Sequence, residues 1–184
     1  MPAELFLIVP TDAPAETLAD ALRATLAERE VAALLLPRGS LGENAYKALA
    51  KTIVPLAQQA GAAALIEGEP GLVRLLGADG LHVSGDIKAV REAVDALKPQ
   101  LIVGVGDVHS RDDAMRKGEL DVDYILFGPL SGPITPAERE MARWWAETME
   151  IPSVLSDPVA AYANYDAEGC EFIGLALGLT GPAE

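Results

Sequence analysis

The chain has 184 residues, half of them hydrophobic, which is ample for one packed core, so we expect a single domain over residues 1–184. With 14 basic and 28 acidic residues its formal net charge is −14, which would repel a phosphate backbone, so we expect no nucleic-acid partner. The first residues, MPAELFLIVP, have no basic flank and only a short apolar run, so we expect neither a signal peptide nor contact with a membrane. The single cysteine, Cys170, has no partner for an internal disulfide, which favours a cytoplasmic location.

Eight short apolar runs, each bounded by turn-forming residues, predict eight β-strands. Near-continuous apolar runs of this length are typical of strands that are buried on both faces of a parallel sheet. The predicted strands are residues 5–10, 31–37, 63–68, 80–85, 101–108, 123–129, 152–157 and 170–179.

The stretches between these runs have apolar residues at helical spacing, such as Leu18, Leu22 and Leu26. Helix starts are predicted where a hydroxyl precedes an acid by three residues, at Ser40, Ser110 and Thr135, and where Asp157 precedes Pro158. Pro55 lies inside the helical pattern of residues 43–60, where we expect a kink or a break. The stretch at 69–77 has room for about two turns.

Eight strands that alternate with helices can close into a (β/α)₈ barrel or open into a doubly wound sheet. The number of strands and their spacing favour an α/β fold of the TIM-barrel class. Three acids stand just before predicted strands, at Asp79, Asp123 and Glu171. We expect them on the N-terminal face of the barrel, where an acid stabilises the fold by accepting backbone N–H groups.

The end of the chain is too short for the eighth helix of such a barrel, because only the five residues TGPAE follow the last apolar run. Along that run Phe172, Gly174, Ala176 and Gly178 point to one face, which we assign to the interior. The other face carries Ile173, Leu175, Leu177 and Leu179. The outer face would then be bare, and a bare apolar strip usually marks an interface. We therefore predict a homodimer through this flank.

A barrel site is built from the C-terminal ends of its strands and the loops that follow them. The predicted mouth residues are Asp12, Arg38, Glu67, Glu69, Ser84, Asp86, Asp107, His109, Ser110, Arg111, Ser131, Thr135, Ser156 and Asp157. Carboxylates predominate over arginines in this set, which favours a divalent metal, an amine or a cationic ring as the ligand. The alternative is that a chain with 28 acids simply places several of them in loops.

The two histidines give two different hypotheses. His109 follows Asp107 closely, and a neighbouring carboxylate can orient an imidazole for proton transfer, so these two residues are the catalytic candidates; the alternative is a role at the start of a helix. His82 lies in the middle of a strand, where a hydrogen-bonded core histidine is the ordinary interpretation and substrate binding is the alternative.

Three motifs carry a resemblance to a known family. GADGLHV at 77–83, IVGVGDVHS at 102–110 and DVDYILFGP at 121–129 resemble the thiamine phosphate synthase family, whose members are TIM barrels. The resemblance implies the coupling of a pyrimidine pyrophosphate to a thiazole phosphate in thiamine biosynthesis, with Mg²⁺ to neutralise the leaving group. It also implies Asp86, and less directly Glu67, as metal ligands.

The loops after the strands differ from the family pattern. Arg38 is the only cation after the second strand, Glu67 and Glu69 replace the Asn-Asp-Arg of the family after the third, and the loop at 130–140 keeps Thr135 but has no lysine. After the seventh strand, Ser156-Asp157-Pro158 replaces a pair of glycines. The substrate-binding candidates that remain are Arg38, His82, Ser84, Ser131, Thr135, Ser156 and Asp157.

These losses remove donors that phosphorylated substrates need, so we expect little synthase activity. Three functions stay open: a divergent synthase, a barrel that binds a cationic or neutral heteroaromatic molecule at its mouth, and another enzyme that uses Asp107, His109 and a metal at Asp86.

Overall fold

Eight parallel strands pair in chain order and close into a barrel in the computed structural model, which describes residues 2–179. The strands are β1 (Glu4–Ile8), β2 (Ala33–Leu36), β3 (Ala63–Ile66), β4 (Gly80–Val83), β5 (Ile102–Val105), β6 (Tyr124–Phe127), β7 (Ser153–Ser156) and β8 (Phe172–Ala176). Each predicted apolar run contains one of them, and β8 pairs with β1, so the barrel prediction is confirmed.

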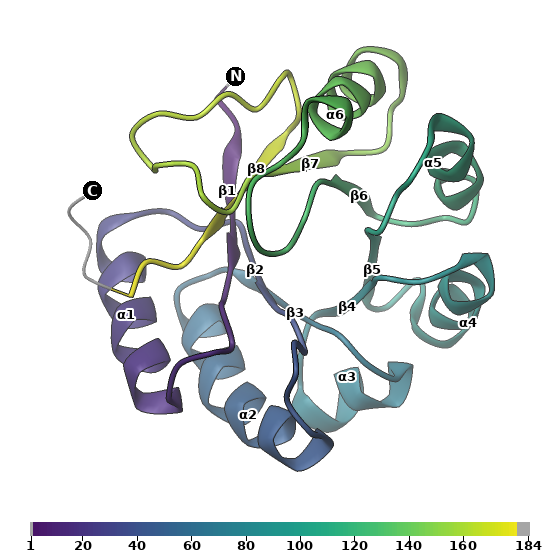
Figure 1. Cartoon of the computed structure of the whole chain (residues 1–184). Helices are drawn as coiled ribbons and strands as arrows, with labels where there is room; N and C mark the ends of the chain where they lie inside the picture. The colour runs from purple at the N-terminus through teal and green to yellow at the C-terminus, as the bar shows by residue number, and fades with distance from the viewer. Residues whose placement is uncertain (1, 180–184) are drawn as a thin grey trace.

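Helices cover the outside of the barrel after each of the first six strands (Figure 1). They are α1 (Ala15–Glu28), α2 (Glu43–Gln59), α3 (Pro70–Leu76), α4 (Ile87–Leu97), α5 (Arg111–Gly118) and α6 (Pro136–Thr148). None of these helices is both long and apolar enough to cross a bilayer, a statement that covers residues 2–179.

Two of the predicted helix starts are confirmed. The Ser110 hydroxyl accepts a hydrogen bond from the Asp113 N–H, and Thr135 forms a reciprocal capping box with Glu138. The prediction at Ser40 is wrong, because α2 begins after Gly42, which has no side chain to cap it.

Of the kink or break predicted at Pro55, the break is wrong, since α2 runs through it as one helix, and the kink stays a prediction. Pro55 lies on the exposed side of α2, so the carbonyl that loses its hydrogen bond can be solvated by water. The opposite side is held against the barrel by buried Ile53, Val54 and Ala57. Packing of this apolar side outweighs the local cost of the proline.

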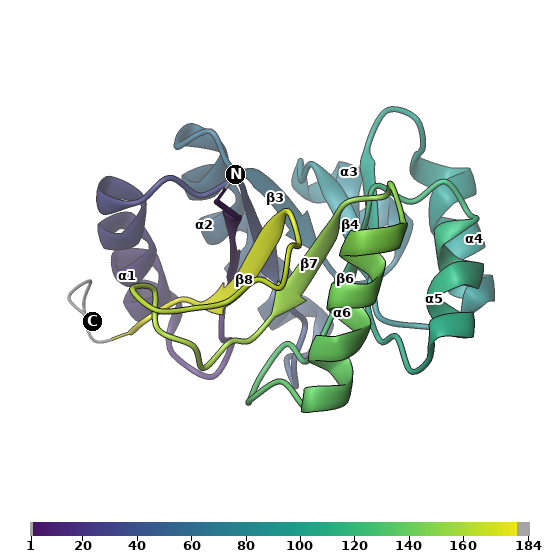
Figure 2. The same ribbon diagram turned by 90° about the horizontal axis from the view of Figure 1, so that it is seen from above.

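The predicted helix after Asp157 is absent, and residues 157–171 form an irregular connection between β7 and β8. Figure 2 shows this segment running in front of β8, across the gap between α6 and α1. The Asp157 carboxylate pairs with Arg139 of α6, 3.1 Å away, rather than capping the turn that follows it. We call residues 157–171 the strap.

The outer face of β8 is covered within the single chain, contrary to the prediction of a bare strip. Of the four residues of that strip only Leu179, which follows the strand, is exposed, at 38%. Ile173, Leu175 and Leu177 are each no more than 2% exposed and belong to the hydrophobic core that lies between barrel and helices. Tyr162 of the strap packs against this core and donates a hydrogen bond from its hydroxyl to the Ala176 carbonyl, at 2.7 Å. The stated reason for a homodimer is therefore removed, and the dimer itself stays a prediction.

The chain does not form a helix at residues 177–179, where its described part ends. The remainder of the segment for which we predicted a missing eighth helix, residues 180–184, lies outside the described residues.

The three acids before alternate strands lie where the sequence places them. Each carboxylate accepts a hydrogen bond from a backbone N–H at or next to the start of the preceding strand. Asp79 accepts from Ala64 at 2.7 Å, Asp123 from Val103 at 2.8 Å and Glu171 from Ser153 at 2.8 Å. The expected role in holding the N-terminal face of the barrel is confirmed by this geometry.

Candidate functional site at the barrel mouth

A cavity of about 630 Å³ opens at the C-terminal ends of the strands. Its polar wall is formed by Thr11, Asp12, Ser40, Glu67, Ser84 and Ser131. Its apolar wall includes Pro10, Pro37, Leu130, Pro158 and Val159. This volume is in the range of sites for small organic molecules, and its combination of an apolar wall with a few polar groups is typical of them.

Four of the predicted mouth residues line this cavity, namely Asp12, Glu67, Ser84 and Ser131. The Glu67 carboxylate is fixed in place, because its Oε1 accepts the backbone N–H of Arg38 at 2.9 Å. Its own backbone N–H donates to the hydroxyl of Tyr46, also at 2.9 Å. Glu67 is therefore a positioned acid rather than a mobile surface side chain.

Arg38 adjoins the cavity but directs its guanidinium elsewhere. Its Nε donates to the Leu41 carbonyl at 3.1 Å, and its Cζ lies 5.8 Å from the centre of the Tyr46 ring. Arg38 is a predicted substrate-binding residue, and in this conformation it supports the loop after β2.

Tyr46 is a functional position that the sequence analysis missed. Its side chain is fully buried, and its hydroxyl donates to the Leu36 carbonyl while accepting from Glu67, so it joins the ends of β2 and β3. Burial raises the pKa of this phenol well above its usual range, which keeps it a neutral donor. Its place in the apolar stripe of α2 gave only a packing signal.

The other substrate-binding candidates near β6 and β7 are held by local contacts. Ser156 is fully buried and donates to the Pro129 carbonyl, whereas Thr135 caps α6. Asp157 pairs with Arg139. The structure places these three residues beside the mouth, outside the wall of the cavity, and their role as ligands stays a prediction.

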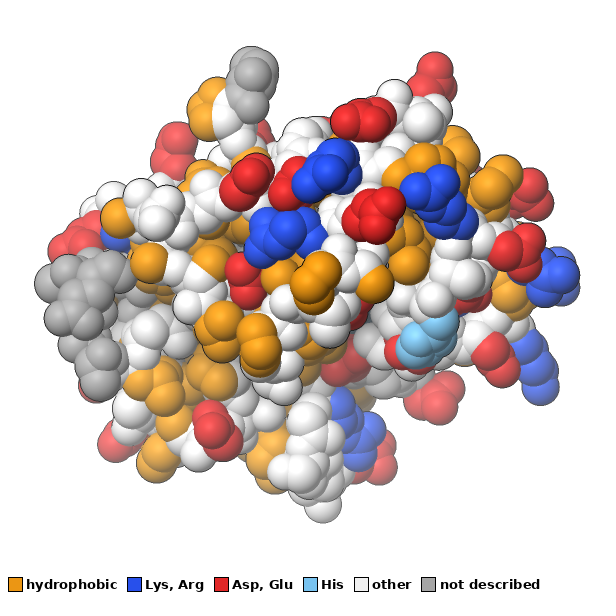
Figure 3. Space-filling view, turned by 45° about the horizontal axis from the view of Figure 1, so that its top comes forward, with side chains coloured by type: hydrophobic (Ala, Val, Ile, Leu, Met, Phe, Trp, Pro, Cys, Tyr) orange, Lys and Arg blue, Asp and Glu red, His pale blue; other side chains and the backbone are white. Residues whose placement is uncertain are grey.

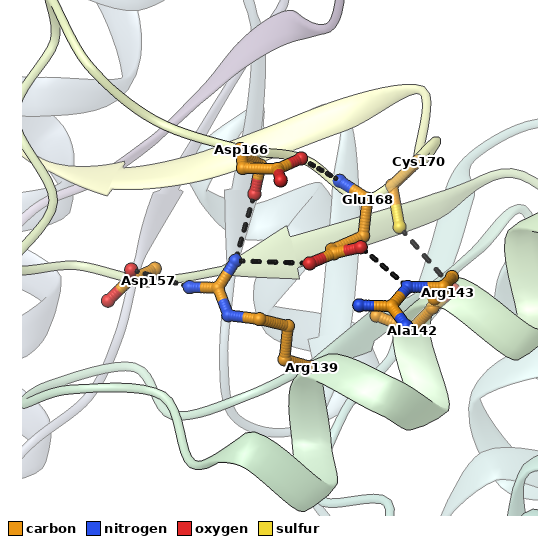
Figure 4. Close-up of polar contacts among 7 residues, drawn as sticks. All are labelled: Arg139, Ala142, Arg143, Asp157, Asp166, Glu168 and Cys170. Carbon is orange, nitrogen blue, oxygen red and sulfur yellow. Dashed lines mark hydrogen bonds and ion pairs between the residues drawn. The ribbon is translucent and has the colours of Figure 1, made fainter.

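Two arginines of α6 attach the strap to the barrel (Figure 4). Arg139 bridges Asp157 and Glu168, at 3.1 and 3.9 Å, and donates to the Asp166 carbonyl at 3.1 Å. Arg143 adds a 2.6 Å pair to Glu168. Because Pro158 and Val159 of the same strap line the cavity, this network also positions one wall of the mouth.

His82 lies inside the barrel, where its Nδ1 is 2.7 Å from the Tyr124 hydroxyl and its side chain is only 1% exposed. Its Nε2 has no hydrogen-bond partner among the described residues and faces Gly106, where an added Cβ would come within 2.8 Å. Burial lowers the pKa of His82 to about 3, so the imidazole is neutral at physiological pH. This supports the interpretation as a core histidine.

The catalytic candidates are in contact with each other. The Nε2 of His109 lies 2.9 Å from the Asp107 carboxylate, but both side chains are solvent-exposed and neither lines the cavity. Below them, Lys117 of α5 is only 3% exposed and donates to the carbonyls of Gly106 and Asp107, at 3.3 and 2.9 Å. No pattern in the sequence indicates that this lysine is buried, and it holds the loop after β5.

The metal candidates do not converge. Asp86 is exposed and caps α4, with its Oδ1 accepting the Ala89 N–H at 3.0 Å, whereas Glu67 faces the cavity. Residues 2–179 contain no group of three histidine, cysteine or acidic side chains arranged to hold a metal ion. Asp86 and Glu67 thus do not fit a shared magnesium site. Magnesium binding stays a prediction.

The face of the molecule that Figure 3 shows carries no continuous basic patch. Blue basic and red acidic side chains lie interspersed there, with hydrophobic side chains between them. The expectation that the protein has no nucleic-acid partner, drawn from the net charge of −14, stays a prediction.

Comparisons with known proteins agree with the fold and with the motifs at 77–129. A family model described as thiamine monophosphate synthase matches residues 5–163. The thiamine-phosphate synthase of Rhodospirillum centenum is 33% identical over 155 residues, which cover 82% of this chain and 75% of that protein. The thiamine-phosphate synthase of Hyphomonas neptunium is 31% identical over 187 residues, which cover 95% of this chain and 85% of its own length.

Solved structures show the same architecture. Thiamine phosphate pyrophosphorylase from Pyrococcus furiosus matches with a TM-score of 0.73 at 19% identity, over 94% of this chain and 85% of that one. Orotidine 5'-phosphate decarboxylase from Pyrococcus horikoshii matches with a TM-score of 0.62 at 12% identity, over 92% and 88% of the two chains. At these identities the likeness shows the fold alone.

Proposed function

Because the chain belongs to the thiamine monophosphate synthase family, we propose that it is a barrel of that lineage whose mouth binds a small organic molecule but couples the two phosphorylated substrates poorly or not at all. One observation carries this proposal: the wall of the mouth cavity contains no lysine or arginine among residues 2–179.

The coupling reaction places heavy demands on cations. A pyrophosphate leaving group accumulates negative charge, which must be met by metal ions, by lysine or arginine, or by backbone N–H groups. Here the mouth presents Asp12 and Glu67 instead, and the guanidinium of Arg38 is held by the Leu41 carbonyl. Carboxylates in those positions repel both substrates.

The strap removes a second source of donors. Pro158 has no N–H, and the N–H of Asp157 donates to the Gly174 carbonyl at 2.9 Å. Neither residue can therefore donate a backbone hydrogen bond to a phosphate after β7. The remaining polar side chains of the wall are hydroxyls, which suit a neutral or cationic ligand.

The test compares this protein with the synthase of Rhodospirillum centenum as a positive control. Both are given the pyrimidine pyrophosphate and thiazole phosphate with magnesium, and binding of thiamine is measured by calorimetry. We expect detectable thiamine binding but no turnover within about tenfold of the usual range of about 1 to 10³ per second. Turnover in that range would contradict the proposal.

A second candidate is a synthase with rearranged donors. It is favoured by the 31–33% identity to proteins named as thiamine-phosphate synthases, over at least 82% of this chain. Under this function the guanidinium of Arg38 would leave Leu41 and turn into the mouth. Turnover that is abolished by Arg38→Ala, but not by substitution of exposed Arg91, would support it.

A further inference from the structure

Glu67 has an unusual electrostatic position for an acid in a ligand cavity. Its side chain is half-buried, one carboxylate oxygen accepts the Arg38 N–H, and no ion pair to Glu67 exists among residues 2–179. Arg38, which bonds to this carboxylate, offers it a backbone N–H, while its guanidinium donates to the Leu41 carbonyl. The negative charge is thus anchored but left without a counter-charge from the protein.

The position of Glu67 is enforced from behind. Its backbone N–H is bonded to Tyr46, which is fully buried and is itself bonded to the Leu36 carbonyl. The backbone at Glu67 is therefore held by Tyr46, and the carboxylate cannot turn away without losing its hydrogen bond from the Arg38 N–H. A partly desolvated carboxylate of this kind gains free energy when a cation reaches it.

The opposite wall determines what kind of cation fits. Pro10, Pro37, Leu130, Pro158 and Val159 present an apolar surface, whereas a hydrated metal ion would need polar ligands all round. Ser84 and Ser131 add hydroxyls that can meet one polar substituent. The complementary ligand has a compact apolar body, one positive charge and no phosphate.

We propose that Glu67 selects a monocationic organic molecule, such as a protonated amine or a cationic heteroaromatic ring, at the mouth of the barrel. The proposal rests on the proposed function, because it requires that the mouth bind a ligand. It goes further by naming the selecting residue and the charge of the ligand.

Two probes separate charge from shape. Thiamine carries a cationic thiazolium ring, and thiamine monophosphate adds a phosphate of roughly −2 to the same body. Calorimetry at about pH 7.5 is carried out on the wild type, on Glu67→Gln and on Glu69→Gln. Glu69 is an exposed acid outside the cavity wall, so its substitution makes the same change in net charge without changing the site.

We expect wild type to bind thiamine about tenfold more tightly than thiamine monophosphate. Glu67→Gln is expected to weaken thiamine binding about tenfold, because the amide keeps an acceptor for Arg38 but loses the charge. Glu69→Gln is expected to bind as wild type does, and thermal unfolding verifies that both variants are folded.

Each of the other outcomes would overturn either selection by Glu67 or the proposed function as a whole. Equal thiamine affinity of wild type and folded Glu67→Gln would overturn selection by Glu67 while leaving ligand binding intact. Wild type that binds thiamine monophosphate as tightly as thiamine would overturn it without recourse to any variant. Wild type that binds neither probe would overturn the proposed function, and this inference with it.

Discussion

The Tyr124 hydroxyl lies 2.7 Å from Nδ1 of His82, and both side chains are buried inside the barrel. The pair crosses from β6 to β4 over β5, where Gly104 and Gly106 leave the space that the two rings occupy. At Gly104 an added Cβ would lie within 2.0 Å of the Tyr124 ring. The His82–Tyr124 pair therefore fits inside the barrel only because Gly104 of β5 and Gly106 just after it have no side chain.

Burial of neutral His82 predicts a pH dependence of stability. The imidazole has a folded-state pKa of about 3, against an unfolded value of 6.5, so below 6.5 the unfolded chain binds a proton that the native state does not. The free energy of unfolding should therefore fall as pH falls from 6.5 towards 3, by roughly 1 kcal/mol per pH unit from this group.

The measurement compares urea unfolding of wild type and His82→Gln between about pH 6.5 and pH 5, where few carboxylates titrate. We expect a shallower loss in His82→Gln than in the wild type. Parallel slopes for the two proteins would mean that His82 binds a proton in the folded state as readily as in the unfolded chain.

The fold was predictable because the signals for it are local and repeated. Each buried strand is an apolar run in the sequence. An acid that accepts a backbone N–H stands just before each of β4, β6 and β8. The strap was not predictable from Asp157 and Pro158, because Asp157 is engaged by Arg139, eighteen residues before it in the chain. A capping signal is local, whereas the ion pair that overrides it is tertiary.

The site was predictable to the level of which loops form it. Glu67, Ser84 and Ser131 follow strands and do reach the cavity. The contacts that hold Arg38 away from it depend on Leu41 and on the ring of Tyr46, which the sequence placed only in the core of α2. Side-chain direction in a loop follows from such contacts, and they are not encoded in spacing.

The arginine network of the strap gives a second prediction. Arg139 is 29% exposed and pairs with Asp157, which is 15% exposed, so the pair is partly desolvated. Its loss leaves the Asp157 carboxylate unpaired, whereas Glu168 keeps its pair with Arg143. Arg139→Ala should destabilise the protein by about 1 to 3 kcal/mol and loosen the strap locally.

Hydrogen exchange followed by mass spectrometry is the suitable measurement. Peptides from the strap should exchange faster in Arg139→Ala, whereas β3 and β4 keep their protection. Arg91→Ala, which removes an exposed arginine from α4, is the control. Unchanged exchange in the strap would mean that the Arg143–Glu168 pair, Tyr162 and the apolar contacts hold it in place without Arg139.

Asp86 distinguishes a helix cap from a metal ligand. Its carboxylate accepts the Ala89 N–H, so Asp86→Ala should lower the free energy of unfolding by about 1 kcal/mol, whereas Asp86→Asn, which can cap equally well, should cost far less. Thermal unfolding with and without magnesium measures both effects. A magnesium-dependent stabilisation that both variants lose would instead identify Asp86 as a ligand of the ion.

Leu175 tests whether the outer face of β8 is completed by the strap or by a second copy of the chain. Its side chain is 1% exposed within one chain, so Leu175→Ala should destabilise the protein by about 2 to 5 kcal/mol at any protein concentration. Exposed Leu75 of α3 is the control, and its substitution by alanine should change stability by less than about 0.5 kcal/mol.

Unfolding is followed at about 1 and 100 μM together with light scattering, because the stability of an obligate dimer rises with concentration. If stability is independent of concentration, the strap provides the cover that an eighth helix gives in a complete (β/α)₈ barrel. A mass twice 19.3 kDa, with a midpoint that rises with concentration and a Leu175→Ala defect that shrinks with it, would instead show that this flank is completed by pairing.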